Sequence, residues 1–568
     1  MKHTLFRRLL GLCLAALLMV PAMAAEPSKA GQRQEDLDFL YEKVLLEAHP
    51  NAFANTPESE FLALKAEIEA RLETESDTEF LLDLMRLTSL TGDSHTSVSV
   101  GGSASFRAYP FAMVRRGESW YLSAAKPEDR DLLCQEVTAL AGKPVAEVVE
   151  TFGTLFSSDN PVHLRRQFRQ ACNVADIYEY LGLVKAGEPL TVTLKNGKTL
   201  RLEPMDMEAM NKLEIALISE LIKGQPETAA ADANYLSMPL NETTYYIQYN
   251  ACVEDEDLPM EDFAAKVWGD LDNGVYSRIV LDLRNNGGGS DGLIWPVLEA
   301  VQSSTSRGAE LVGLIGERTF SSALINAVEI QEMGGVLVGE ATGGSVCHFG
   351  AVKTFTLPNS KARGQVSSKY LDLNTLLDAA AGRGVEALDP DVEVSQTLED
   401  TLNGRDTAVE WLLSHPEKLS QREYPDAPLT RGRFIGQLYE ALGRPDASWD
   451  TPPFSDCFGV EWYLHPLNWA YQNGIALGAA DGTFSAARPI TWKEASAFLT
   501  RAADVLNLEA APGHRSGPIP AALAQGGSQE AVTRAWDLGL IPADADFAQG
   551  LTRSQGEELA AGLKALLD

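Results

Sequence analysis

Apolar residues recur every three to four positions in the first part of the chain, from about residue 33 to residue 91. The runs Asp36–Tyr41 and Glu79–Leu87 both have this spacing, which is that of one face of an α-helix. His49-Pro50-Asn51 interrupts the pattern, because proline has no amide hydrogen with which to continue a helix. We therefore expect helices on both sides of Pro50, and strands within 105–125, where the pattern becomes alternating.

Residues 134–205 show a different pattern, with short strand-like runs and strong turn signals. The runs Leu190–Leu194 and Thr199–Leu202 flank Asn196-Gly197, a dipeptide favoured in tight hairpin turns. Upstream, Val137–Val145 combines an apolar run, a turn at Gly142 and a helix start. This order resembles a PDZ-like module, whose sheet edge can bind peptide termini; a purely structural insert is the alternative.

Between residues 240 and 400, short apolar runs alternate with segments of helix length, one of them near 260–272. Such nearly continuous apolar strands with helical crossovers predict an α/β core. The four runs that we expect to be its strands are Tyr245–Tyr249, Arg278–Leu283, Glu310–Ile315 and Gly335–Gly339.

After about residue 418 a short unit recurs. Leu429-Thr430-Arg431, Ile490-Thr491-Trp492 and Leu551-Thr552-Arg553 each precede a run of helical pattern, and their starts lie 61 residues apart in both intervals. A constant period of this size indicates repeats that stack on one another to bury their apolar faces. We therefore predict an all-α repeat bundle at this end of the chain.

The first 24 residues have the form of a secretory signal peptide. Basic residues are followed by the apolar run Leu9–Val20 and by Ala22-Met23-Ala24, which has the A-x-A form of a cleavage site. We expect cleavage before Ala25 and a secreted product. No other segment of the sequence is a candidate membrane span, so no membrane association is expected after cleavage.

Charge and cysteine content narrow the partners. The chain has 80 acidic and 47 basic side chains and a net charge of −33, which repels nucleic acid and anionic lipid. Five cysteines follow the leader without any CxxC pair, which fits neither a disulfide framework nor a zinc site. We expect no nucleic-acid partner, no metal and no cofactor.

Three separated stretches carry the candidate chemistry: Gly92–Thr96, Leu281–Gly289 and Thr319–Ala323. A strand that ends in Asn-Asn-Gly-Gly-Gly can turn sharply and expose N–H groups, which stabilise an oxyanion. A serine pair at a helix start can place a hydroxyl and an N–H beside that turn. A serine hydroxyl also needs a base within reach. His3 belongs to the leader and His415, His465 and His514 lie beyond the core, which leaves His49, His95, His163 and His348.

These stretches resemble the tail-specific, or C-terminal processing, serine peptidase family in its tricorn-core-like branch, over about residues 33–400. The family motif DLRxNxGG matches Asp282–Gly289, TxSxA matches Thr319–Ala323, and GExTGG matches Gly339–Gly344. The resemblance implies a crotonase-like core that hydrolyses peptide bonds without a cofactor. It also implies that Ser321 is the nucleophile and that the N–H groups of Gly288 and Ser322 form the oxyanion hole.

The resemblance also bears on the base. Processing peptidases use a lysine where this chain has Ser345, so a Ser-Lys dyad is excluded. The tricorn-like branch has a Ser-His pair upstream, which Ser94-His95 matches; it implies that His95 deprotonates Ser321 while Ser94 orients the imidazole. Glu386 is a candidate for the glutamate that completes the relay in that branch, and His348 is an alternative base. The competing reading is a protein of this fold that binds a peptide or another ligand without cleaving it.

The repeats resemble S-layer homology modules over about residues 425–568. The middle copy carries the resemblance, with Phe454-Ser455-Asp456, Trp462-Tyr463 and Asp481-Gly482-Thr483-Phe484. The resemblance implies binding to anionic secondary cell-wall polysaccharide through Arg431 and Arg553, with Trp492-Lys493 at the middle position. A Gram-positive type of envelope follows from it.

The sequence therefore predicts a multidomain α/β protein in five parts. They are a signal peptide (1–24), an N-terminal helical region with the Ser-His motif (25–130), a PDZ-like insert (131–208), an α/β serine peptidase core (209–415) and S-layer homology repeats (425–568).

Overall fold

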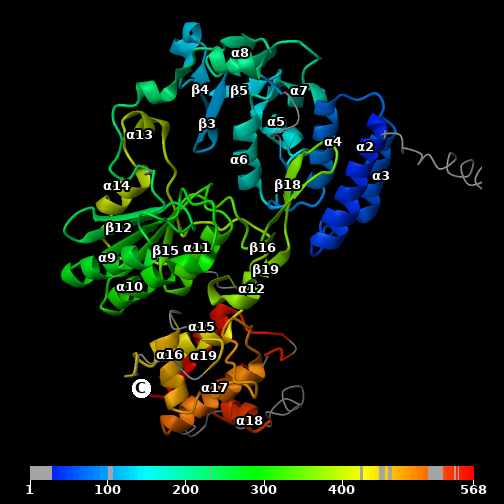
Figure 1. The fold of residues 1–568 in the computed structure, drawn as a ribbon. Coiled ribbons are helices and arrows are strands. Elements are labelled where there is room, and N and C mark those ends of the chain that lie inside the picture. The colour runs from blue at the N-terminus through cyan, green and yellow to red at the C-terminus, as the bar shows by residue number, and fades with distance from the viewer. Residues whose placement is uncertain are drawn as a thin grey trace, which may run out of the picture.

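A computed structural model gives the fold of most of the chain (Figure 1). The residues it describes are 28–99, 106–229, 232–380, 382–422, 427–446, 454–457, 463–508, 529–542, 545–547 and 549–567. The expected signal peptide and Trp462 of the repeats lie outside these ranges. None of the described helices combines the length and the apolar character needed to cross a bilayer.

The N-terminal region is helical, as its apolar spacing predicts. Its helices are α2 (Lys29–Phe39), the π-helical η1 (Leu40–Ala48), α3 (Glu58–Glu69) and α4 (Asp77–Ser89). The predicted break at Pro50 is confirmed, because η1 ends with His49 in an extended conformation. A capping box of Ser76 and Glu79 starts α4, since it satisfies backbone N–H groups that have no partner inside the helix.

Next along the chain come three small antiparallel sheets. Their strand orders are β10-β4-β3, β6-β5-β7-β8 and β2-β9. The Asn-Gly turn joins β7 to β8 as predicted, with Gly197 at φ 84°. Buried residues of this region and of the N-terminal helices form one continuous hydrophobic cluster. The elements are β2 (Arg107–Ala108), β3 (Ala112–Arg116), β4 (Ser119–Ala125), η2 (Pro127–Leu132), β5 (Val137–Leu140), β6 (Lys143–Pro144), α5 (Val145–Phe152), α6 (Pro161–Ala171), α7 (Ala175–Tyr180), β7 (Leu190–Leu194), β8 (Thr199–Leu202), β9 (Met205–Asp206), α8 (Met207–Lys212), β10 (Ala216–Leu217) and η3 (Ile218–Leu221).

A six-stranded sheet forms the predicted α/β core, in the order β11-β12-β13-β14-β15-β20. Only the β11–β12 pair is antiparallel; the other four are parallel. Alternate strand residues pack against α9, α10 and α11 on one face and against α14 on the other. The elements are β11 (Tyr235–Pro239), β12 (Thr244–Tyr249), α9 (Met260–Asn273), β13 (Arg278–Asp282), η4 (Asp291–Ile294), α10 (Trp295–Ser306), β14 (Glu310–Ile315), α11 (Ser322–Glu332), β15 (Val336–Gly339), β20 (Val392–Glu393), α13 (Leu398–Leu402) and α14 (Thr407–Ser414).

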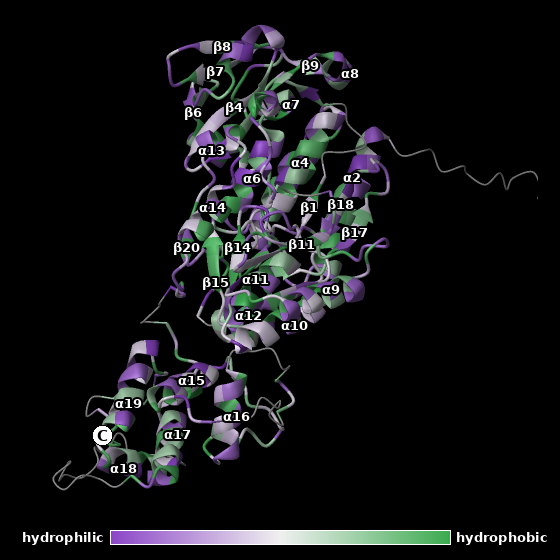
Figure 2. Ribbon diagram, turned by 90° about the vertical axis from the view of Figure 1, so that its left-hand side faces the viewer, coloured by the Kyte–Doolittle hydropathy of each residue, from purple (hydrophilic) through white to green (hydrophobic). Residues whose placement is uncertain are grey.

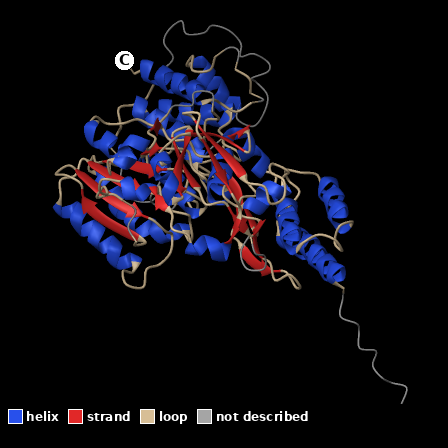
Figure 3. Ribbon diagram, turned by 90° about the horizontal axis from the view of Figure 1, so that it is seen from above, coloured by secondary structure: helices blue, strands red, loops and turns tan. Residues whose placement is uncertain are grey.

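Both faces of this sheet are covered, which explains its composition. β14 and β15 appear in the colours of hydrophobic residues (Figure 2), and the helices lie on either side of the strands when the molecule is seen from above (Figure 3). Strands that are buried on both faces need apolar side chains at nearly every position. The mixed helix-and-sheet class predicted from the sequence is therefore observed.

An arm leaves the core after β15 and reaches the N-terminal region. It consists of β16 (Cys347–Gly350), β17 (Lys353–Thr356), β18 (Arg363–Val366), β19 (Lys369–Asp372), α12 (Leu373–Leu376) and η5 (Asp378–Ala380). β18 pairs with β1 (Ser97–Val98), which directly follows the Ser-His motif. Figure 1 shows β18 beside α4, far from the other core strands. The arm thus ties the core to the segment that carries His95.

The C-terminal repeats form a separate helical bundle with its own hydrophobic cluster. Its helices are α15 (Arg431–Ala441), α16 (Leu464–Gln472), α17 (Trp492–Val505), α18 (Gln529–Asp537) and α19 (Arg553–Ala565). Thr430, Thr491 and Thr552 cap α15, α17 and α19 by accepting an N–H bond.

The three repeat starts also meet in space. Leu429 donates its N–H to Leu551, Leu551 donates to Ile490, and Ile490 donates to Leu429. The result is a closed ring of hydrogen bonds among equivalent positions 61 residues apart. The predicted repeat period is confirmed, and each repeat start is completed by the other two.

Candidate active site

Ser321 occupies a sharp turn between β14 and α11. It precedes the first residue of α11 and has φ 55° and ψ −127°, a conformation that is costly for a residue with a side chain. Backbone bonds from Ala323 to Phe320 and from Leu324 to Ser321 hold the turn. Within the described parts of the chain, the Ser321 hydroxyl has no hydrogen-bond partner. The fold therefore presents this hydroxyl at the N-terminal end of a helix, where developing negative charge is stabilised.

The glycine turn after β13 lies against this serine. Gly288 has φ 100°, and a Cβ atom there would lie 2.8 Å from Ser321 Cβ and 3.1 Å from the Ser322 nitrogen. Only glycine permits so close an approach of the two backbones. The Gly288 N–H donates to Asn286 Oδ1 at 2.9 Å, and the Ser322 hydroxyl donates to the Gly289 carbonyl at 2.8 Å. Gly288, Ser321 and Ser322, which the sequence assigns to one site, are thus neighbours.

His95 comes from the loop between α4 and β1, and Asp93 organises that loop. Asp93 is fully buried; it accepts the His95 backbone N–H at 2.8 Å and the Thr96 hydroxyl at 2.5 Å. His49 accepts the Asn51 N–H at its Nδ1 atom, so its Nε2 atom carries the hydrogen that bonds Asp93 at 3.1 Å. Burial acts to raise the pKa of Asp93, but the hydrogen bonds from His49 and Thr96 outweigh it and lower this pKa.

Four aromatic rings line this part of the site. His95 stacks on Phe320, the residue before the nucleophile, with ring centroids 4.4 Å apart, and on His348 at 5.3 Å. His163 stacks on Phe320 at 4.8 Å. Among the described residues, neither ring nitrogen of His95 has a hydrogen-bond partner. The ring contacts place the imidazole of His95 beside the turn that carries Ser321.

Burial keeps these histidines neutral. Desolvation, reinforced by His348, lowers the pKa of His95 to about 4, although the Asp93 carboxylate opposes it. Burial and then Arg166 lower the pKa of His163 to about 3. Burial also lowers the pKa of His348, whose Nδ1 lies 2.7 Å from the Ser345 carbonyl. That Nδ1 must donate, because a carbonyl only accepts, so the Nε2 atom of neutral His348 carries the lone pair.

Ser94 contacts a carboxylate that the sequence reading did not single out. Its hydroxyl donates to Asp159 Oδ1 at 2.6 Å and accepts the Asp159 N–H at 3.0 Å. Burial raises the pKa of Asp159 to about 6 against the effect of the Ser94 bond. The neighbouring Asn160 caps α6 and donates to the Ser345 hydroxyl at 2.9 Å. Ser94 therefore lies in a network that joins the insert to the core, rather than in a hydrogen bond with the His95 ring.

Glu386 lies on an exposed loop. Its carbonyl accepts the Val346 N–H at 2.8 Å, and among the described contacts none joins its side chain to His95. The acid nearest to His95 that the structure identifies is Asp93, with Oδ1 4.0 Å from His95 Nδ1. Asp93 lies two positions before His95 in the stretch Gly92–Thr96, so the motif itself was the signal that could have pointed to this acid.

Asp159 and His163 had weaker signals. Asp159 belongs to the sequence Asp-Asn-Pro, which is typical of a helix start and gives no sign that this aspartate faces the site. His163 is one of the four candidate histidines, but nothing in the sequence places it on Phe320. Within the described residues, no group of three His, Cys, Asp or Glu side chains is placed to hold a metal ion. The cysteines Cys134, Cys172, Cys252 and Cys347 form no disulfide.

Comparisons with known proteins give distant likenesses. No family model and no curated protein matches the chain. Among solved structures, mature CPAF is similar at 14% identity and a TM-score of 0.45, over 68% of this chain and 96% of that chain. A photosystem II D1 C-terminal processing protease is similar at 14% identity and a TM-score of 0.31, over 67% and 98%. A lipoprotein from Streptococcus agalactiae has 16% identity and a TM-score of 0.22, over 32% and 71%.

Proposed function

We propose that this chain is a serine peptidase that cleaves peptide bonds through an acyl-enzyme on Ser321. The observation that carries the proposal is the strained turn that holds Ser321 at the start of α11, against the glycine turn of Gly288 and beside a neutral, buried imidazole. Oxyanion donors, a nucleophile and a base are the parts that acyl transfer needs.

His95 is the better candidate for the base. Its ring packs on Phe320, next to the nucleophile, whereas the His348 ring packs on His95. A neutral His95 accepts the Ser321 proton as the hydroxyl attacks, and returns it to the leaving amine. Asp93 Oδ1, 4.0 Å from His95 Nδ1, stabilises the imidazolium that forms in between.

The oxyanion of the tetrahedral intermediate needs N–H donors beside Ser321. The Ser322 N–H starts α11, and the Gly288 N–H joins it when it exchanges its bond to Asn286 Oδ1. Each such donor contributes about 3–4 kcal/mol of transition-state stabilisation in a site without water. Substrate binding that displaces Asn286 from Gly288 would therefore complete the hole.

One observation favours a second candidate, a binding protein without catalysis. No hydrogen bond joins Ser321 to any histidine among the described residues, and the Gly288 N–H is already engaged. In that case the same cleft would hold a peptide without cutting it.

Fluorophosphonate labelling distinguishes the two candidates. We expect the wild type to form a covalent adduct, detected by intact mass, and Ser321→Ala to form none. His95→Ala should lower the labelling rate at least 100-fold, in keeping with the contribution of a general base, while His348→Ala keeps most of it. Loss of labelling in His348→Ala, with His95→Ala unaffected, would move the base to His348. A wild type that stays unlabelled at every pH would favour the binding protein.

The proposal extends to the location of the enzyme, secreted and held at a Gram-positive type cell wall. It is supported by the leader pattern of residues 1–24 and by the three capped repeat starts 61 residues apart. Arg431, an expected polysaccharide ligand, bonds the Phe484 carbonyl and Glu494 inside the bundle. Co-sedimentation with purified wall fragments, before and after extraction of their polysaccharide, tests this part.

The proposal also takes the four-stranded sheet β6-β5-β7-β8 as the PDZ-like part of the chain. Its edge strand would bind a peptide terminus by strand addition and deliver it to Ser321.

A further inference from the structure

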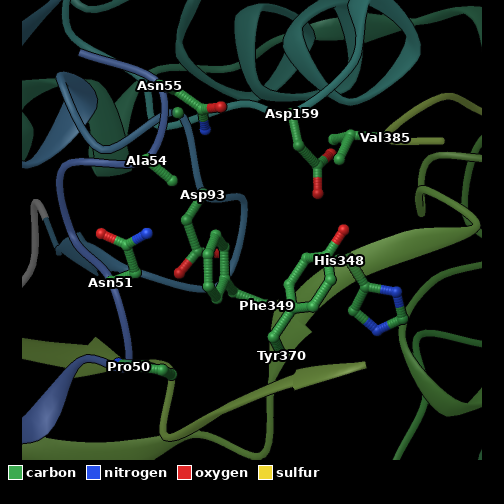
Figure 4. A pocket seen from close by; sticks show the side chains of 11 residues that line it. Pro50, Asn51, Ala54, Asn55, Asp93, Asp159, His348, Phe349, Tyr370 and Val385 are labelled. Carbon is green, nitrogen blue, oxygen red and sulfur yellow. The ribbon is translucent and has the colours of Figure 1, made fainter. Parts of the chain in front are cut away.

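A cavity of about 430 Å³ lies beside His348 of the arm (Figure 4). It lies between the loop after η1, the Gly92-Asp93 turn, Asp159 and strands β16 and β19. His348 in its wall stacks on His95, so the cavity is one ring away from the proposed base. Its volume is at the small end of the range for ligand sites, about 300–1,000 Å³, and suits a single side chain.

Two residues that line this cavity each have a buried acceptor without a donor. Asp159 Oδ2 and His348 Nε2 are buried and have no hydrogen-bond partner among the described residues. His348 is 2% exposed, and its Nδ1–H is used by the Ser345 carbonyl, so its Nε2 atom can only accept while the ring is neutral. Figure 4 shows the Asp159 carboxyl group pointing into the cavity, towards the Tyr370 hydroxyl. A buried acceptor without a donor is costly, and a bound donor would remove that cost.

The charge of the cavity has one sign. Asp93 and Asp159 line it, and no lysine or arginine of the described chain does. Asp93 already accepts three hydrogen bonds, from His49, His95 and Thr96, so Asp159 is the carboxylate left to meet a ligand. The whole chain, at a net charge of −33, attracts cations towards this site.

The other walls are apolar or aromatic. Pro50 and Val385 offer apolar surface to an alkyl stem, and the rings of Phe349 and Tyr370 lie on the same cavity, 4.9 Å apart between centroids. Aromatic faces attract cations, and alkyl stems of lysine and arginine pack on apolar surface while their charged ends find polar groups.

We propose that this cavity is a specificity subsite that takes the basic side chain of a peptide substrate, with Asp159 as the counter-charge for its ammonium or guanidinium group. The inference rests on the proposed peptidase function, whose substrate class it names. His348 stacks on His95, which stacks on Phe320, so two stacking distances separate His348 from the residue before Ser321. Since an extended peptide rises about 3.3 Å per residue, the basic residue lies a few positions from the scissile bond.

Binding without turnover tests the cavity itself. The full mature chain is titrated with n-butylammonium, n-butylguanidinium and the neutral n-butanol, by calorimetry or ligand-observed NMR. We expect both cations to bind at least ten-fold more tightly than n-butanol. Asp159→Asn should remove this preference. Ala54→Lys brings a cation into the cavity lining and should lower cation affinity at least ten-fold. Ala63→Lys is the matched control, because Ala63 is exposed on α3 and does not line the cavity. Equal affinity for cations and n-butanol, or an Ala54→Lys variant that binds like Ala63→Lys, overturns the inference.

Peptide pairs then identify the source of the cation. Acetylated fluorogenic peptides that differ only by lysine against norleucine should differ at least ten-fold in kcat/KM, and the difference should vanish in Ala54→Lys but not in Ala63→Lys. A preference only for a free N-terminal amine on the norleucine peptide would overturn the side-chain assignment. Fluorophosphonate labelling of Ser321 separates the two proposals. If Ser321 is labelled but the protein shows no cation preference, the subsite proposal is wrong and the peptidase proposal stands. If the chain binds cations but is never labelled, the subsite proposal stands and the peptidase proposal is wrong.

Discussion

Ser321, the proposed nucleophile, is held in a backbone conformation that costs energy. A non-glycine residue at φ 55° and ψ −127° carries strain of about 1–3 kcal/mol. The strain is held by tight neighbours: a Cβ atom at Gly344 would lie 3.3 Å from the Ser321 nitrogen, and one at Gly288 would lie 2.8 Å from its Cβ. Ser321 follows directly after Phe320, on whose ring His95 stacks.

The pH dependence of labelling should report the buried state of His95. Its pKa of about 4 lies below the ordinary value for histidine because burial disfavours the charged ring. The ring is neutral, and able to accept a proton, at every pH above about 4. We expect the rate of fluorophosphonate labelling to be level from pH 6 to pH 8 and to fall as the pH drops through about 4. An acid limb centred near pH 6.5 would contradict a buried His95 as the base.

The arm is the element that joins the two halves of the site. Ser97 and Val98 of β1 pair with Gln365 and Gly364 of β18, and the Ser367 N–H donates to the Thr96 hydroxyl at 3.0 Å. Further along the arm, Asn359 donates its N–H to Asp36 of α2. His95 is thus held by a hairpin of the core, while Ser321 is held by the sheet and α11.

A substitution at the pairing site should separate these two roles. A Cβ atom at Gly364 would lie 2.5 Å from the Ser97 carbonyl oxygen, so Gly364→Ala should disturb the β1–β18 pair. We expect labelling of Ser321 to slow at least ten-fold while circular dichroism shows a folded chain. Gly269→Ala is the control, because nothing lies within 4 Å of a Cβ atom there; alanine within α9 should stabilise by about 0.5–1 kcal/mol. Normal labelling of Gly364→Ala would show that the arm does not position His95.

The molecule as a whole divides by its hydrophobic clusters. One cluster joins the N-terminal helices to the insert, two lie on the faces of the central sheet, and one belongs to the C-terminal bundle. Because the described residues of the bundle bury their apolar side chains in a cluster of their own, we expect the bundle to fold as an independent unit.

Truncation of a buried side chain in the bundle should therefore leave the site intact. Leu438 is fully buried in α15. Leu438→Ala should lower the free energy of unfolding of the bundle by about 2–5 kcal/mol, which calorimetry should show as a shift of one unfolding transition. We expect Ser321 labelling at 25 °C to remain that of the wild type. Leu281→Ala, equally buried in β13, is the comparison and should lower the stability of the core and the labelling together. Loss of labelling in Leu438→Ala would mean that the bundle and the site fold as one unit.

Local patterns predicted much of the fold and part of the site. The π-helical η1 ends at Ala48, just before Pro50, the Asn-Gly turn forms a hairpin, and three threonines start helices at a constant interval, because proline chemistry, turn geometry and capping act within a few residues. The same holds for Ser321 beside Ser322 at the start of α11. The positions of Asp159 beside Ser94 and of His163 on Phe320 could not be predicted in this way, since these residues look like an ordinary helix start and an ordinary helix residue.

By itself the sequence determined the helical start of the chain, the alternation of strands and helices in the core, the repeat period and the candidates for nucleophile, oxyanion donors and base, since each depends on residue type and near neighbours. Only the tertiary structure decided which histidine stacks on Phe320, that Asp159 faces a cavity beside His348, and that β18 of the arm pairs with the strand that follows the His95 loop. These relations join segments far apart in the chain, and their distances are set by the packing of buried side chains between whole elements, which no local pattern records.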